Sequence, residues 1–209
     1  SASVYDPVRE RLLVFGGTTA SGMRLNEVWS LSFAGPASWT LLAPAGQPPS
    51  PRDLCTAIYD PLRDRTVVFG GRTQVGDLNE TWVLSMAGAP TWSRLVAQGA
   101  FPGPREQHAA IYDPVRDRMI VYGGETARSF YKDVWALSLD GTPTWTELYP
   151  SGPTPSGRST VAIYDPPRDR MVFFSGRGAF DDTWALSLEH SLEWTLLAPS
   201  GPPARHGHI

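Results

Sequence analysis

The chain has 209 residues, of which 41% are hydrophobic, and a formal net charge of −3 at neutral pH, which is typical of a globular protein. It contains no run rich in Lys and Arg, so a nucleic-acid partner is not expected. No stretch approaches the ~18 apolar residues of a membrane-spanning helix, and a single cysteine, Cys55, excludes an internal disulfide.

A repeat begins at the N-terminus, where an apolar run at residues 2–5 leads into Tyr-Asp-Pro. This tripeptide recurs at intervals of 54, 53 and 52 residues. A glycine follows twelve residues after each Tyr, and two Trp residues ten positions apart come later in each copy. The Tyr residues are Tyr5, Tyr59, Tyr112 and Tyr164, and the glycines are Gly17, Gly71, Gly124 and Gly176.

One copy shows which elements the repeat builds. Short apolar runs predict four strands, at residues 109–112, 119–122, 134–137 and 144–148. Asp113 and Pro114 predict a turn between the first two, because Pro presets φ and Asp bonds the backbone ahead of it. A single sheet of four short strands leaves apolar faces exposed to water, so the sheets formed by the copies must stack on one another. Almost no helix is expected, because no 3.6-residue period persists.

The spaced signals resemble the kelch family: a diglycine after an apolar strand, a Trp about eleven residues later and a second Trp after ten more. In the fourth copy Ser175-Gly176 replaces the diglycine, and only Gly176 keeps the need for an unusual backbone conformation. The resemblance implies an all-β fold, a kelch-type β-propeller of four four-stranded blades. The repeats occupy residues 1–51, 52–104, 105–157 and 158–204, and residues 205–209 start a fifth inner strand.

Both ends of the chain fall at the same phase of the repeat, and kelch relatives commonly have more than four blades. The chain is therefore expected to be a window of a larger propeller, or part of a ring completed by another chain, which would make it a homo-oligomer. The repeats look like those of bacterial kelch proteins, and this resemblance implies an extracellular or periplasmic location.

Length and sequence vary most between the second glycine of each copy and its first Trp. Variable loops on a rigid scaffold are where binding residues concentrate, and Arg and aromatic side chains are enriched at binding hot spots. The predicted partner is a protein or a carbohydrate. The other interpretation is that these are solvated loop residues whose rings fold against their own blade. The candidates are Arg24, Arg72, Arg128, Phe130, Tyr131, Arg177 and Phe180.

Each crossover between blades leads to an arginine at one repeat position. A constant position favours a structural role, such as bonding the carbonyls of nearby loops. The alternative is a positively charged channel mouth, which would favour anionic ligands. These arginines are Arg52, Arg105, Arg158 and Arg205.

Three residues that ligate metals elsewhere, Cys55, His108 and His208, share one repeat position. We interpret them as packed inner-strand residues, because equivalent positions in different blades lie well apart, and we expect neither a metal nor a cofactor. The ligand sets of the copper-oxidase and nitrile-specifier types of kelch enzyme do not match, and no Ser/His/Asp or phosphate-binding motif occurs. No catalytic residue is assigned.

The sequence therefore predicts a non-catalytic binding module that presents variable loops on one propeller face. The alternative is a carbohydrate-active, mutarotase-like enzyme with its site at the loop face near the central channel. Convergent carboxylates with perturbed pKa values would favour the enzyme, and an apolar or arginine-lined patch with a polar rim would favour binding.

Overall fold

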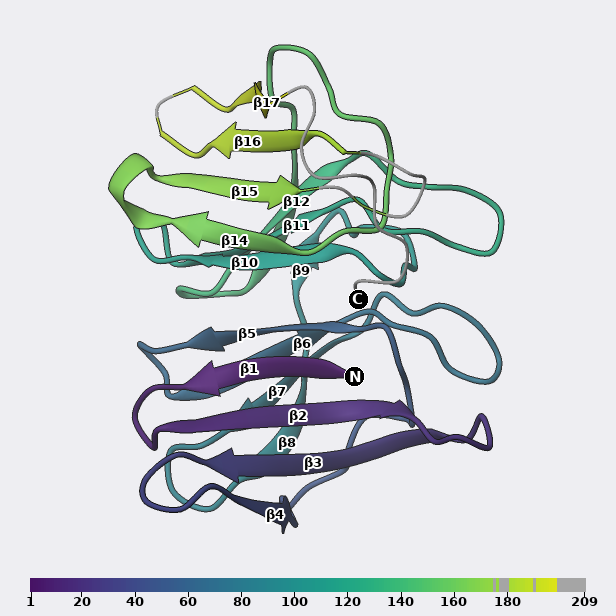
Figure 1. Cartoon of the computed structure of the whole chain (residues 1–209), viewed down its shortest axis with the longest axis vertical. Coiled ribbons are helices and arrows are strands. Elements are labelled where there is room, and N and C mark those ends of the chain that lie inside the picture. Colours follow the sequence, from purple (N-terminus) through teal and green to yellow (C-terminus); the bar gives the residue numbers. More distant parts are fainter. Residues whose placement is uncertain (175, 177–180, 190, 199–209) are drawn as a thin grey trace. The chain divides into compact units, whose positions relative to one another are not determined.

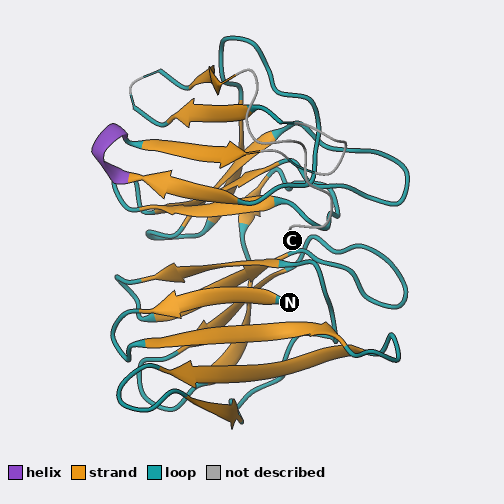
Figure 2. Ribbon diagram, viewed as in Figure 1, coloured by secondary structure: helices purple, strands orange, loops and turns teal. Residues whose placement is uncertain are grey.

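The structure is a computed structural model that describes residues 1–174, 176, 181–189 and 191–198. Strands form four antiparallel sheets, each with four strands in chain order, and one of them gains a short fifth strand. Among the described residues the helical content is a single 3₁₀ turn, Pro166–Arg168, the purple segment of Figure 2. No described helix has the length and apolarity that crossing a membrane requires. The all-β prediction is confirmed.

The chain divides into two compact units, Ser1–Val96 and Ala97–Ile209. Unit 1 holds blades 1 and 2, whose strands lie side by side in Figure 1. Blade 1 consists of β1 (Ala2–Asp6), β2 (Arg11–Thr18), β3 (Arg24–Ser32) and β4 (Ser38–Leu42). Blade 2 consists of β5 (Thr56–Asp60), β6 (Arg65–Phe69), β7 (Thr81–Ser85) and β8 (Thr91–Leu95).

Unit 2 holds blades 3 and 4. In blade 3 the predicted strands appear within one residue of their expected ends. Blade 3 consists of β10 (Ala109–Asp113), β11 (Arg118–Tyr122), β12 (Val134–Ser138) and β13 (Thr144–Leu148), and β9 (Gln98–Gly99) adds parallel to β13. Blade 4 consists of β14 (Ala162–Asp165), β15 (Arg170–Phe174), β16 (Thr183–Ser187) and β17 (Glu193–Ala198).

The Tyr-Asp-Pro turns close as the sequence predicts. In blade 3 the buried Asp113 carboxylate accepts hydrogen bonds from the backbone N–H groups of Val115 (3.1 Å) and Arg116 (3.2 Å). The same carboxylate receives Nε of Arg118 at 2.8 Å. Asp117 then takes a positive φ of 46°, which brings the chain back into β11. The aspartate thus holds the turn and anchors the first residue of the next strand.

Each unit has a core between its two blades. In unit 1, Leu13 and Phe15 of blade 1 pack on Val68, Leu84 and Trp92 of blade 2. Unit 2 repeats the arrangement with a larger set: Ala109, Ile111, Ile120, Tyr122, Val134 and Ala136 of blade 3 contact Met171, Phe173, Trp184, Leu186, Leu188 and Trp194 of blade 4. Five of the eight repeated Trp residues are buried, and Tyr59 is the one buried Tyr of the four Tyr-Asp-Pro turns. Stacked propeller blades bury their faces in this way.

The glycine that follows each inner hairpin is required by its backbone. Gly124 has a φ of 90°, and a Cβ there would lie 2.7 Å from the carbonyl oxygen of Glu106 and 2.8 Å from Cβ of His108. Gly176 has a φ of 140° and approaches the carbonyl oxygen of Ser159 in the same way. The surviving glycine of the fourth copy therefore keeps the conformation that the sequence led us to expect.

Candidate functional site

In blades 1, 2 and 3 the loop between the second and third strands emerges at the same end as the crossovers between blades, opposite the Tyr-Asp-Pro turns (Figure 1). We call this end the loop face. Backbone bonds join the two kinds of segment. In unit 1 the N–H of Arg52 in the crossover donates to Leu25 of blade 1, and Asp53 pairs with Arg72 of blade 2. The loop face is therefore a connected layer in each unit.

The crossover arginines form a buried frame beneath this layer. The side chains of Arg52, Arg105 and Arg158 are at most 1% exposed. Nε of each donates to the carbonyl oxygen two residues earlier in the chain, at 3.0–3.1 Å. Arg52 and Arg105 also donate to the carbonyls of Gly70 (3.1 Å) and Gly123 (2.9 Å). These donors satisfy backbone carbonyls that burial removes from water.

A carboxylate completes each arginine site. Asp133 accepts both Nη groups of Arg105 at 2.7 Å and also the indole N–H of Trp135 at 2.7 Å. The same three partners recur as Arg52, Glu80 and Trp82, and as Arg158, Asp182 and Trp184. Burial raises the pKa of each carboxyl, but the hydrogen bonds and charge of its arginine outweigh burial, so each pKa lies below its ordinary value. We call these three sets the Arg–acid–Trp frame.

In unit 1 the candidate Arg24 lies in β3 rather than in a loop, because β2 and β3 continue past the diglycine to pair Thr18 with Arg24. Its Nε donates to Asp53 at 2.6 Å, and its Nη1 donates to Gln74 at 3.2 Å. Thr18 also donates to Asp53, at 2.7 Å. Burial raises the pKa of Asp53, but the hydrogen bonds from Thr18 and Arg24 lower it by more than burial raises it. The pKa therefore lies below its ordinary value, and the carboxylate stays charged. Arg24 therefore ties blade 1 to the loop of blade 2.

The second candidate of unit 1, Arg72, belongs to the same layer. Its backbone forms antiparallel bridges with Asp53 and Asp77, and its side chain, 37% exposed, has Nε 3.9 Å from the Asp77 carboxylate. Arg24 and Arg72 are thus brought to one region through Asp53 and the loop that carries Gln74. Met23 and Val75, which the sequence did not single out, are the exposed apolar side chains of these two loops.

In unit 2 the three adjacent candidates differ in accessibility. The Tyr131 ring is partly buried, and the guanidinium carbon of Arg105 lies 4.1 Å from its centroid, so the ring packs on the Arg–acid–Trp frame. Phe130 stays 45% exposed although its Cβ faces Gly157 of the following crossover. Arg128 at the loop tip is exposed. The structure therefore places Arg128 and Phe130 on the surface and Tyr131 beneath it.

The remaining candidates of the fourth blade and the C-terminus, Arg177, Phe180 and Arg205, lie outside the described residues, as does His208.

The inner-strand position holds two buried side chains among the described residues. Burial raises the pKa of the Cys55 thiol to about 11. Burial, together with the charge of Arg105, lowers the pKa of His108 to about 3. Cys55 therefore stays a thiol and His108 a neutral imidazole. Within the described part of the chain no three His, Cys, Asp or Glu side chains are arranged to hold a metal.

Two buried carboxylates of unit 2 were not singled out from the sequence. Glu106 and Glu125 pair through reciprocal backbone hydrogen bonds of 2.9 Å at the start of the loop face, and the Gln107 amide donates to Glu125 at 2.9 Å. The equivalent pair in blade 2 is Asp53 and Arg72. A comparison of Glu125 with Arg72, the residue at the same repeat position in blade 2, would have shown this difference in the sequence.

The acids of the Arg–acid–Trp frame were also missed. Each precedes a first Trp by two residues, as Glu80, Asp133 and Asp182 do, so an acid-x-Trp pattern was visible in the sequence. Its partner arginine lies 24 to 28 residues earlier, and the sequence contained no signal that joined the two.

Comparisons with known proteins agree with this geometry. Residues 1–159 match a family model described as the KLHDC2/KLHL20/DRC7 Kelch-repeats domain. A solved structure of YjhT superposes with a TM-score of 0.71 at 16% sequence identity, covering 97% of this chain and 65% of that one. At this identity the structural match shows the fold alone.

Three curated relatives have names that describe different kinds of protein. The chain is 32% identical over 151 residues to the flagellar outer arm dynein alpha chain of Chlamydomonas reinhardtii, and 31% identical over 167 residues to the serine/threonine-protein phosphatase BSL2 of Arabidopsis thaliana. It is 29% identical over 169 residues to host cell factor 1 of Homo sapiens. The matches cover 68%, 69% and 71% of this chain but only 3%, 16% and 8% of those proteins.

Proposed function

Since the chain belongs to the kelch-repeat family, we propose that it is a non-catalytic binding module that presents its loop face to a protein partner. The observation that carries this proposal is the contrast between a constant buried frame and variable exposed side chains in the loops above it. The Arg–acid–Trp frame is the same in blades 2, 3 and 4, whereas the side chains exposed above it differ from blade to blade. A rigid base with variable loops is the usual arrangement of a recognition surface.

The chemistry of the tips supports a protein partner. Arg128 and Phe130 are exposed on one loop of unit 2, above a Tyr131 that is held in place by Arg105. Arginine and aromatic side chains contribute most to protein interfaces, and an ordered base lowers the entropy lost on binding. The relatives support the same interpretation. A dynein chain, a phosphatase and host cell factor share this repeat region but not one named activity, so the region itself is best explained as a scaffold.

The test is affinity capture with the immobilised chain, comparing wild type with the double variant Arg128→Ala and Phe130→Ala. The matched control is Val115→Ala, an exposed residue of the Tyr-Asp-Pro turn at the opposite end of blade 3. The proposal predicts a protein that wild type and control retain and the loop variant loses. With that protein purified, the dissociation constant should rise about tenfold or more, which corresponds to about 1.4 kcal/mol. Capture that is equal for all three chains, or binding to a glycan array alone, would refute the proposal.

One observation favours the alternative, a carbohydrate-active enzyme. Glu106 and Glu125 are buried side by side at the loop face, and paired carboxyls are the groups that acid–base chemistry on sugars uses. The alternative predicts that the chain accelerates interconversion of the α and β anomers of an aldose, followed by NMR exchange, and that Glu125→Gln abolishes this. Equal rates with and without protein across a panel of aldoses would leave the binding module as the function.

A further inference from the structure

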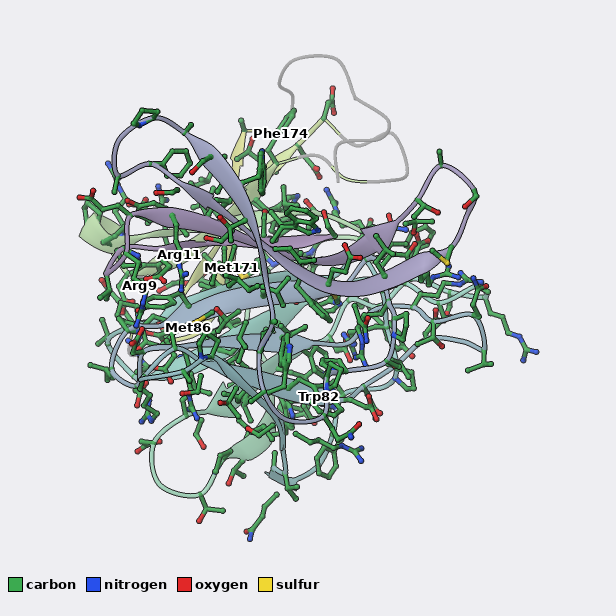
Figure 3. All side chains as sticks on the ribbon, turned by 90° about the horizontal axis from the view of Figure 1, so that it is seen from below. Arg9, Arg11, Trp82, Met86, Met171 and Phe174 are labelled. Carbon is green, nitrogen blue, oxygen red and sulfur yellow. The ribbon has the colours of Figure 1, made fainter. Side chains whose placement is uncertain are left out.

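The arginines that the structure describes are, with one exception, paired with carboxylates of the same chain, at N···O distances of 3.9 Å or less. Figure 3 shows two of them, Arg9 and Arg11, directed toward Met86. Arg9 donates both Nη groups to Asp64, at 2.8 and 2.7 Å, and Nη2 also donates to the carbonyl of Met86. Arginine is therefore mainly a structural cation in this protein.

The exception is Arg128, at the tip of the loop that joins β11 to β12. Its side chain is exposed, and within the described part of the chain it forms no ion pair or hydrogen bond. Lys132, the one lysine of the sequence, lies four residues further along the same loop. It is also exposed, and no described residue forms an ion pair or hydrogen bond with its side chain. Two basic side chains without a carboxylate therefore lie on one loop.

The tip of this loop is closed by its own hydrogen bonds. Glu125 and Phe130 form an antiparallel bridge, and the N–H of Thr126 donates to the carbonyl of Ser129 at 2.9 Å. The N–H of Arg128 donates to the Thr126 hydroxyl at 3.2 Å. The backbone that carries Arg128 is thus ordered before any partner arrives, which lowers the entropy lost on binding.

The crossovers on both sides of the loop approach it through glycines. A Cβ at Gly103 would lie 2.7 Å from the hydroxyl of Tyr131, and a Cβ at Gly157 would lie 2.7 Å from the Tyr131 carbonyl oxygen. Tyr131 is held between them, whereas Phe130 beside it stays 45% exposed. Phe101, two residues before Gly103 in the first crossover, is 51% exposed. The loop and the crossover that touches it therefore each present a phenylalanine ring to solvent.

The acids around this loop leave its exposed charge positive. Glu125 is 6% exposed and accepts the Gln107 amide, and the two carboxylate oxygens of Asp133 are bound by Arg105. The two crossovers, residues 97–104 and 150–157, contain no charged residue. The exposed surface of the loop thus combines two positive charges with two aromatic rings.

We propose that this loop binds an acidic peptide segment of the protein partner. Carboxylates of the segment pair with Arg128 and Lys132, and an apolar side chain of the segment packs on Phe130 and Phe101. Charge complementarity favours this occupant, because the other described arginines have carboxylates of their own chain, and a segment with carboxylates supplies the missing partners. The exposed rings provide the apolar anchor that protein interfaces use. This inference rests on the proposed function and names the chemical class of its partner.

The test measures retention of synthetic peptide pools on the immobilised chain. Four pools have equal length. Three of them share the apolar residues Leu, Val and Phe and differ in their other positions, which are Asp and Glu, Ser and Asn, or Lys and Arg. The fourth is acidic but has Ser in place of the apolar residues. The acidic apolar pool should be retained about tenfold or more above each of the others, and its retention should fall as salt is added, because salt screens exposed charges.

Two variants locate the site. Arg128→Glu should lower retention of the acidic apolar pool about tenfold or more, and combining it with Lys132→Glu should shift the preference to the basic pool. The matched control is Arg168→Glu, which changes the net charge as much as Arg128→Glu does, at an arginine 64% exposed in the Tyr-Asp-Pro turn of blade 4. It should retain the pools as wild type does. Circular dichroism of each variant verifies that the blades remain folded.

Three results would overturn the inference: retention of no pool, equal retention of the acidic apolar pool and either the neutral or the all-polar acidic pool, and equal losses for Arg128→Glu and Arg168→Glu. The proposed function fails separately. A purified partner whose capture depends on Arg128 and Phe130, together with no preference among the pools, would leave the binding module in place and remove only the acidic segment.

Discussion

Burial determines the charge of His108. The side chain is 2% exposed, and burial and the charge of Arg105 lower its pKa to about 3. In the unfolded chain the pKa returns to about 6.5, so the unfolded state binds more protons between these two values. Stability from the neutral imidazole is therefore complete above about pH 6.5 and is lost as the pH falls toward 3.

We expect the free energy of unfolding in urea to be lower at about pH 5 than at about pH 7.5 for this reason. The matched variant is His108→Cys, which copies the residue at the equivalent position of blade 2, Cys55, and does not titrate in this range. Its stability should change little between the two pH values. An equal decrease in both proteins would show that His108 is not the group responsible.

Arg105 is a buried cation whose role is structural. It bonds the Asp133 carboxylate through both Nη groups and stacks on the Tyr131 ring. Removing one member of a buried pair leaves the other charge without compensation. We expect Arg105→Met to lower the free energy of unfolding by about 3–5 kcal/mol, whereas Arg128→Met, at an exposed position, should change it by about 0.5 kcal/mol or less. Equal effects in urea titrations would contradict the frame.

At the scale of elements, the turn between the first and second strands of each blade depends on one aspartate. Asp113 is fully buried and accepts two backbone N–H groups as well as the side chains of Arg116 and Arg118. Charged hydrogen bonds of this kind are stronger than neutral ones. The turn therefore orders two strand ends at once.

Asp113→Ala should destabilise the protein by about 3 kcal/mol or more, because Arg118 and two backbone donors lose this acceptor and Arg116 keeps only Asp169. Asp140→Ala, in the exposed turn after β12, is the control and should be close to neutral. Thermal unfolding of the two variants makes the comparison. A small shift for Asp113→Ala would mean that water replaces the carboxylate readily.

The strands of blade 1 show where prediction from pattern failed. The second-glycine-to-Trp segment was expected to be a loop that carries Arg24. Instead, β2 and β3 extend until Thr18 pairs with Arg24, and the turn is confined to residues 19–23. Strand length here depends on which backbone groups find partners, and Arg24 gains Asp53 and Gln74 from the neighbouring blade. A single copy of the repeat contains no information about these partners.

At the scale of the whole molecule, the burial of a tryptophan depends on the neighbouring blade and not on its position in the repeat. Trp39 and Trp92 occupy the same place in their repeats, but only Trp92 is covered, by Phe15 and its neighbours in blade 1. We expect Trp92→Ala to cost about 3–5 kcal/mol, as for a buried aromatic. Trp39→Ala should cost about 1 kcal/mol or less, because the ring of Trp39 is 54% exposed. Equal costs would contradict the blade stacking described for unit 1.

The sequence by itself determined the repeat, the four strands of each blade, the Tyr-Asp-Pro turns and the family. These follow from local signals, because alternating apolar residues, turn residues and glycines act over a few positions, and four copies repeat them in step. Only the tertiary structure decided which side chains are buried and which charges pair. The ion pairs join residues that are distant in the sequence: Arg105 and Asp133 are 28 residues apart, Arg24 and Asp53 are 29 apart, and Arg9 and Asp64 are 55 apart. Whether a tryptophan or an arginine is part of the core or of a binding surface depends on the neighbouring blade, since burial is a property of the packed faces and not of the repeat that carries the residue.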